Sequence, residues 1–191
     1  MSSTTYITGT VVTAAWLNTV KTTGRETLWL PAHSWIPNTT NGAELVTNET
    51  TTNDVMYKSL DFDTSTDESA QFSLVMPKNW DEGTLYFRPW WTAASGSGTV
   101  TWAFAGQAVS NDDPIDGTWG TAVTVTDTLL AAGDVHDAGE TAAMTIAGTP
   151  AENDVIYLKV YRDVSADTLG VDAKLLGVHV YLETNAPNDD L

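Results

Sequence analysis

The chain has 191 residues and no cysteine, and its 8 Lys and Arg residues against 25 Asp and Glu residues give a formal net charge of −17. A surface this acidic repels phosphate backbones and anionic lipid, which excludes nucleic acid and membrane surfaces as expected partners. The missing cysteines exclude disulfides, a thiol nucleophile and a thiolate metal site, and no apolar run approaches the roughly 20 residues that span a bilayer.

The N-terminal segment differs in pattern from the rest of the chain. Thr13 has the residue type of a helix N-cap, and the apolar Trp16, Leu17 and Val20 follow it, which predicts a helix of about two turns. A helix this short is marginal alone and needs another surface. The segment also lacks the basic region and apolar core of a signal peptide. The predicted organisation is an anchoring segment over 1–26, one folded domain over 27–186 and a disordered tail over 187–191.

From residue 27 onward the apolar residues mostly recur with period two, as in β-strands. Strands are predicted at 28–30, 55–62, 70–76, 84–91, 99–104, 121–126, 141–147, 155–162 and 174–182. The strand 99–104 points Val100, Trp102 and Phe104 inward. The strand 155–162 is apolar on both faces, with Tyr157 and Tyr161 on the same side, and is therefore expected to be central. The last strand alternates through Leu176, Val178, Val180 and Leu182.

Short strands with regular turns and no long helical window predict an all-β fold, an antiparallel β-sandwich. The jelly roll is the expected topology because its size and strand number match. A barrel and an immunoglobulin-like topology remain open alternatives.

Catalytic motifs are missing from the sequence. No Gly-x-Ser-x-Gly occurs, and the three histidines, His33, His136 and His179, form no metal-binding pair. Paired carboxylates such as those of residues 61–68 could serve a glycosidase, but in a chain of this charge acidic loops are typical of solvated surface. The sequence therefore predicts neither an enzyme nor a cofactor.

One acidic loop has the composition of a cation site. Residues 111–117 place several oxygen-bearing side chains close together, as calcium prefers. The loop lacks the alternate ligand spacing of an EF-hand, so no metal site is assigned. Its candidate ligands are Asp112, Asp113 and Asp116.

The chain has 8 tryptophans. Trp102 is expected in the core, together with Trp29 and one of Trp90 and Trp91, because adjacent strand residues face opposite sides. Trp80 and Trp119 stand beside turn residues and acidic neighbours, a setting in which a ring can stack on a sugar. The candidate ligand-binding residues are Trp80, Trp90, Trp91 and Trp119. The alternative is that these rings anchor loops or lie in a subunit interface.

Several stretches carry a resemblance to a known group of proteins. They are 28–32 (LWLPA), 41–44 (NGAE), 60–63 (LDFD), 70–72 (AQF), 76–84 (MPKNWDEGT), 119–121 (WGT), 145–151 (TIAGTPA), 160–163 (VYRD) and 168–173 (TLGVDA). In these stretches the chain resembles small bacteriophage virion proteins of the tail-fibre, tail-spike and head-fibre (decoration) type. The resemblance supplies no catalytic residues.

The segment 13–20 (TAAWLNTV) is separately similar to the Ala-x-Trp-Leu-Asn segment near the start of many phage tail fibres and spikes, which attaches those proteins to the particle. The anchoring residues that this similarity implies are Trp16, Leu17, Asn18 and Val20. The two resemblances together imply a homotrimeric virion component that is assembled in the bacterial cytoplasm and contacts capsid or tail proteins.

Three functions compete at this point. The leading hypothesis is a phage virion structural protein, on the head or the tail, whose N-terminal segment holds a β-sandwich to the particle. The alternative is a carbohydrate-binding module that recognises host surface polysaccharide. A glycan-degrading enzyme is disfavoured because the sequence shows no catalytic constellation.

Overall fold

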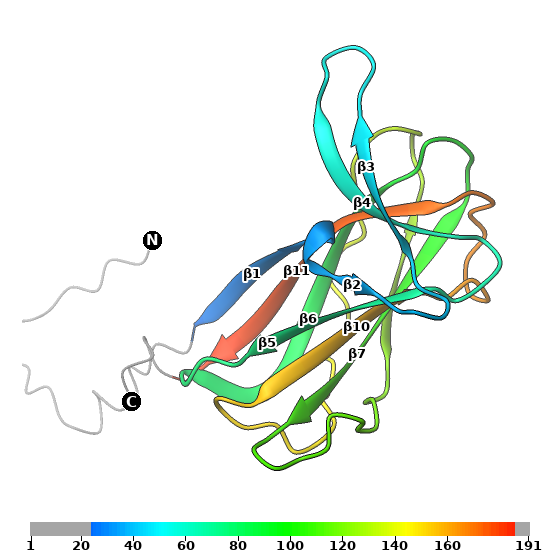
Figure 1. The fold of residues 1–191 in the computed structure, drawn as a ribbon. Helices are drawn as coiled ribbons and strands as arrows, with labels where there is room; N and C mark the ends of the chain where they lie inside the picture. The colour runs from blue at the N-terminus through cyan, green and yellow to red at the C-terminus, as the bar shows by residue number, and fades with distance from the viewer. Residues whose placement is uncertain (1–23, 186–191) are drawn as a thin grey trace, which may run out of the picture.

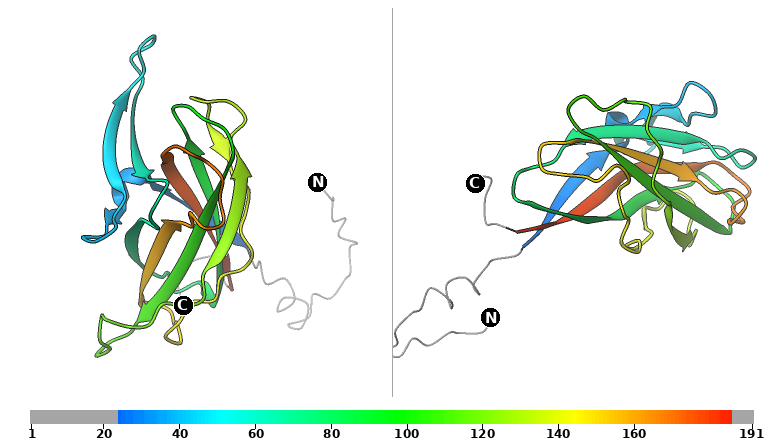
Figure 2. Two further views of the ribbon diagram at one scale, coloured as in Figure 1. Left: turned by 90° about the vertical axis from the view of Figure 1, so that its right-hand side faces the viewer. Right: turned by 90° about the horizontal axis from the view of Figure 1, so that it is seen from below.

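The computed structural model describes residues 24–185 of the chain (Figure 1). Two antiparallel sheets pack face to face (Figure 2). The six-stranded sheet contains β1 (Arg25–Pro31), β3 (Glu44–Glu49), β4 (Met56–Phe62), β6 (Trp80–Thr92), β9 (His136–Asp137) and β11 (Ala173–Thr184). The five-stranded sheet contains β2 (Ile36–Pro37), β5 (Ser69–Val75), β7 (Thr99–Val109), β8 (Val123–Thr128) and β10 (Val155–Arg162). A short 3-10 helix, η1 (Ala32–Ser34), follows β1.

The order of the strands is that of a jelly roll. The eight strands from β4 onward form two four-stranded layers, β4-β11-β6-β9 and β5-β10-β7-β8. Every connection along this part of the chain crosses from one sheet to the other, except the one between β7 and β8. This double winding of two Greek keys is the jelly-roll topology, so the predicted fold class is confirmed and the barrel and immunoglobulin-like alternatives are excluded.

The core lies between the two sheets and follows the predicted alternation. β10 lies between β5 and β7, as expected for the central strand, and buries Ile156, Leu158 and Val160. Phe87 of β6 and Phe104 of β7 stack across the two sheets, with 4.6 Å between ring centroids and 4° between planes. Burial of such apolar and aromatic side chains is the main term that stabilises the sandwich.

A β-bulge in the last strand changes which residues face the core. The pairing of β11 with β6 shifts between Leu175 and Gly177, so one extra residue is inserted there. Leu175 is buried, whereas Leu176, predicted to face inward with Val178, is only half-buried. Strict alternation through the bulge was therefore wrong, although Val178, Val180 and Leu182 are buried as predicted.

Three further details differ from the sequence prediction. Residues 141–147 form no strand and contribute only isolated bridges at Met144 and Ala147. The sequence analysis missed β2, β3 and β9, which are short or largely exposed and so carry little apolar alternation. Trp29 is 46% exposed and not part of the core.

The first strand starts close to the predicted start of the folded domain. The first strand begins at Arg25, where it pairs with Glu183 of β11, two residues before the predicted boundary at 27. The hairpin of β3 and β4 projects beyond the sandwich (Figure 1). The predicted helix, the anchoring residues Trp16, Leu17, Asn18 and Val20, and the tail 187–191 lie outside the described residues. Within residues 24–185, no helix is long and apolar enough to cross a membrane.

Candidate functional site

Burial divides the four predicted ligand-binding tryptophans. Trp80 and Trp91 are fully buried, so neither ring can stack on a ligand, and their assignment to a binding site was wrong. Trp80 is the first residue of β6 and packs into the core; it does not lie in a solvated turn. The indole N–H of Trp91 donates to Oδ2 of Asp127 at 2.8 Å.

The two remaining tryptophans, Trp90 and Trp119, are half-buried and lie on opposite faces of the sandwich. Trp90 points outward from β6, because its neighbour Trp91 is in the core and adjacent strand residues face opposite sides. Trp119 contacts Lys159, which points outward from β10 between the buried Leu158 and Val160. The four residues therefore do not form one site, and each sheet presents its own aromatic surface.

On the five-stranded sheet the outward residues of β10 form a row, named here the β10 row: Tyr157, Lys159 and Tyr161. All three are half-buried, and residues two apart on a strand are roughly 6.6 Å apart on the same face. The Lys159 ammonium lies 5.0 Å from the centroid of the Trp119 ring and 5.5 Å from that of Tyr161. Three aromatic rings and one cation therefore share this face.

A groove of about 440 Å³ adjoins one end of the β10 row. Its lining includes the ring of Tyr157, the exposed Ile36 and polar side chains of β5 and the segment after β2, namely Asn38, Thr39, Gln71 and Ser73. The β5–β10 register sets Ser73 opposite Tyr157 and Gln71 opposite Lys159, so the groove continues directly into the row. Nε2 of Gln71 donates to Oδ1 of Asn38 at 2.8 Å, which orients both amides.

The outer face of the six-stranded sheet carries a different cluster, in which Trp29 and Trp90 flank His179. Trp29 and His179 meet edge to face at 5.0 Å between centroids, and the indole N–H of Trp90 donates to Nδ1 of His179 at 3.2 Å. A methyl group at Gly177 would lie 2.5 Å from the Trp29 ring, so this position must lack a side chain for the ring to lie where it does.

Charged groups beside this cluster are already paired. The Arg25 guanidinium lies 4.4 Å from the centroid of Tyr181 and donates to both carboxylate oxygens of Glu140 at 2.7 and 2.9 Å. Arg88 donates from two nitrogens to Asp137, and this hydrogen bonding holds the pKa of Asp137 below its usual value. The charged groups of this face are therefore paired with one another, whereas the groove on the other sheet presents neutral amides and hydroxyls around a concave surface.

The predicted cation loop does not assemble a metal site. Asp113 accepts the backbone N–H of Ser110 at 3.1 Å and so closes a turn of the loop itself. In the described part of the chain, no three acidic or histidine side chains come together as a metal would require. Asp112, Asp113 and Asp116 are therefore exposed loop residues, and their candidacy as cation ligands is corrected.

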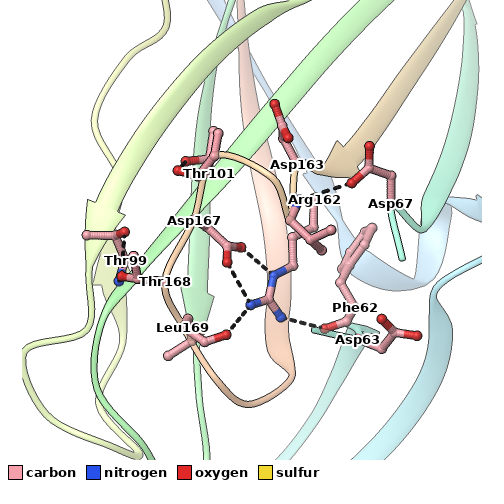
Figure 3. Close-up of polar contacts among 12 residues, drawn as sticks. Phe62, Asp63, Asp67, Thr99, Thr101, Arg162, Asp163, Asp167, Thr168 and Leu169 are labelled. Atoms are coloured by element: carbon pink, nitrogen blue, oxygen red, sulfur yellow. Dashed lines mark hydrogen bonds and ion pairs between the residues drawn. The ribbon is translucent and has the colours of Figure 1, made fainter. Parts of the chain in front are cut away.

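The acidic loop at residues 61–68, considered for glycosidase chemistry, takes part in structural contacts. Asp67 accepts the backbone N–H of Val164 at 3.0 Å, which ties this loop to the one after β10 (Figure 3). Nearby, the buried Arg162 at the end of β10 donates to Asp167 in the loop that follows. These carboxylates hold loops together at one end of the sandwich.

The sequence analysis found part of this site. It identified Trp119 and placed Tyr157 and Tyr161 on one side of their strand, but it described that side only as apolar and did not assign it to a binding site. Lys159, Gln71 and Asn38 were missed, because only the register between β5 and β10 brings them together. The one available signal was the lysine that interrupts the apolar side of residues 155–162.

No family model and no curated protein matches this chain. Among solved structures, it is similar to a CBM35 domain from Cellvibrio japonicus Abf62, with 8% identity, a TM-score of 0.48, and coverage of 84% of this chain and 99% of that one. It is also similar to the CBM22-2 xylan-binding domain of Paenibacillus barcinonensis Xyn10C, with 14% identity, a TM-score of 0.48, and coverage of 81% and 98%. Likeness at this level does not determine what the chain does.

Proposed function

We propose that this chain is a carbohydrate-binding domain without catalytic activity, and that it holds a glycan across the outer face of its five-stranded sheet. The observation that carries the proposal is the groove of about 440 Å³ that continues into the β10 row, with Trp119 beside it. Ligand sites in general are concave and combine apolar or aromatic walls with a few placed polar groups.

The chemistry of this surface matches that of a sugar. A pyranose has C–H faces that pack on aromatic rings and a rim of hydroxyls that need hydrogen-bond partners. Tyr157, Tyr161 and Trp119 supply rings, while the amides of Asn38 and Gln71 supply both donors and acceptors. A tyrosine or tryptophan also loses little conformational entropy on binding, since it has only two side-chain torsions.

Alanine substitutions at the rings test this proposal. We expect Tyr157→Ala and Trp119→Ala each to weaken glycan binding at least about tenfold, the loss typical of an anchoring aromatic residue in an interface. Wild-type protein is first applied to an array of neutral and acidic oligosaccharides, and the affinity of the variants for the retained glycan is then measured by calorimetry.

Trp29→Ala is the matched control, because Trp29 is an exposed ring on the opposite sheet. It is expected to leave the affinity unchanged. Retention of no glycan by the wild type contradicts the proposal. An equal loss in all three variants, or a loss confined to Trp29→Ala, moves the site away from the five-stranded sheet.

We propose as a second candidate that the domain serves as a virion component, which the sequence resemblance to phage fibre and decoration proteins supports. The two functions are compatible if the domain recognises host polysaccharide from the particle. Gold labelling of purified particles with an antibody against residues 27–191 tests this. Label on the tail or the capsid is expected, and particles free of label contradict the virion role.

A further inference from the structure

Lys159 is a half-buried cation of this strongly acidic chain. Four of the positively charged side chains form ion pairs with carboxylates: Arg25, Arg88, Arg162 and Lys174. Within residues 24–185, no ion pair joins Lys159 to a carboxylate, although the chain has 25 Asp and Glu residues. Its charge is therefore available to a group from outside.

The groups in contact with Lys159 are aromatic or neutral, although burial, together with the carboxylates of Asp163 and Asp67, raises the pKa of the neighbouring Tyr161. Its ammonium contacts the rings of Trp119 and Tyr161, and its cross-strand neighbours are Gln71 and Ala105. Burial lowers the pKa of Lys159, and no neighbouring carboxylate counters this effect. Rings that hold a partly desolvated ammonium in place leave it ready for a strong contact with an anion, because a partly buried pair is screened less than an exposed one.

Lys159 also lies beside the groove. It follows Tyr157 on the same face of β10, roughly 6.6 Å along the strand, and faces Gln71, which lines the groove. A sugar that packs on Tyr157 therefore has Lys159 next to it. An anionic substituent on that sugar meets an ammonium that has no other ionic partner in the described domain.

We infer that the glycan held by this face is acidic, and that a pyranose packed on Tyr157 pairs its anionic substituent with the Lys159 ammonium. This inference rests on the proposed function and names its ligand class. Uronic acids and sulfated sugars share this chemistry. The net charge of −17 repels a polyanion at long range. A preference for an acidic glycan therefore depends on the local ion pair with Lys159, formed once the sugar is stacked on Tyr157.

The test compares three oligosaccharides of equal length: a uronate-containing one, its carboxyl-reduced neutral counterpart and a sulfated one. Affinities are measured by calorimetry at about 150 mM salt, where the Debye length is about 8 Å and long-range repulsion is screened. The wild type is expected to bind at least one acidic form about tenfold or more tighter than the neutral form. The acidic form that binds more tightly shows whether Lys159 pairs with a carboxylate or with a sulfate.

Lys159→Met keeps the apolar stem and removes the charge, and it is expected to abolish the preference for the acidic form while leaving affinity for the neutral form unchanged. Lys159→Arg is expected to restore the preference, since it keeps the charge. Lys58→Gln is the matched control because it removes one positive charge from an exposed position of β4, in the other sheet, and it is expected to leave both affinities unchanged.

Equal binding of acidic and neutral forms by the wild type, or an unchanged preference in Lys159→Met, overturns the inference and leaves the proposed function standing. Failure to bind any of the three oligosaccharides, together with an array that retains no glycan, overturns both. Thermal unfolding of each variant confirms that the fold is intact.

Discussion

Replacement of Arg162 by methionine is expected to lower the free energy of unfolding by about 3–5 kcal/mol, the usual cost of breaking a buried ion pair by removing one partner. The Arg162 side chain is 0% exposed and that of Asp167 is 5% exposed. Nε of Arg162 donates to Oδ2 of Asp167 at 2.6 Å. The methionine variant leaves this carboxylate buried without its counter-charge.

Backbone carbonyls add to the expected loss. Nη1 of Arg162 donates to the carbonyl oxygen of Phe62 at 3.1 Å, and Nη2 donates to that of Leu169 (Figure 3). Nη1 also donates to the carbonyl oxygen of Val171 at 2.9 Å. The guanidinium therefore joins the end of β4 to the loop between β10 and β11. Each carbonyl that loses its donor and stays buried costs further free energy.

Urea unfolding followed by circular dichroism measures the effect, with two comparison variants. Arg25→Met removes a cation whose pair with Glu140 is about one-third exposed, with side-chain exposures of 35% and 34%, and is expected to cost less than about 1 kcal/mol. The double variant Arg162→Met, Asp167→Leu removes both charges and should recover part of the loss. A loss below about 1 kcal/mol in Arg162→Met shows that Arg162 does not hold these loops together.

Local patterns in the sequence determined much of the fold. The alternation of residues 99–104 correctly predicted that Val100, Trp102 and Phe104 of β7 are buried, because side-chain direction along a strand has a fixed period of two. It did not predict that Thr101 and Ala103, on the other side of the strand, are buried as well. The same rule failed at Leu176, where a bulge inserts one residue. A bulge depends on how two strands pair, so the local sequence pattern of β11 does not predict it.

The candidate site illustrates the same limit over longer distances. Gln71 and Lys159 are neighbours because β5 and β10 pair in one particular register, and Trp119 reaches Lys159 from a loop 40 residues earlier in the chain. The sequence supplied the residue types of the site but not their grouping. It also assigned Trp90 and Trp119 to one function, although the jelly roll places them on opposite faces.

The different burial of Trp80 and Trp119 can be tested by their effects on stability. Trp80→Ala is expected to cost about 3–5 kcal/mol in unfolding free energy, because the ring is fully buried in the core and its loss leaves a large cavity. Trp119→Ala is expected to cost less than about 1 kcal/mol, because that ring lies on the half-exposed outer face. The two alanine variants therefore separate a structural ring from a binding ring.

Trp80→Phe refines the comparison. The Trp80 Nε1 atom is buried and has no hydrogen-bond partner among the described residues, so phenylalanine removes an unsatisfied donor while keeping most of the ring volume. We expect it to cost clearly less than Trp80→Ala in the same urea titration, and to leave glycan affinity unchanged. Small and equal stability losses in Trp80→Ala and Trp119→Ala would contradict the buried position of Trp80. Trp80 would then again be a candidate for stacking on a ligand.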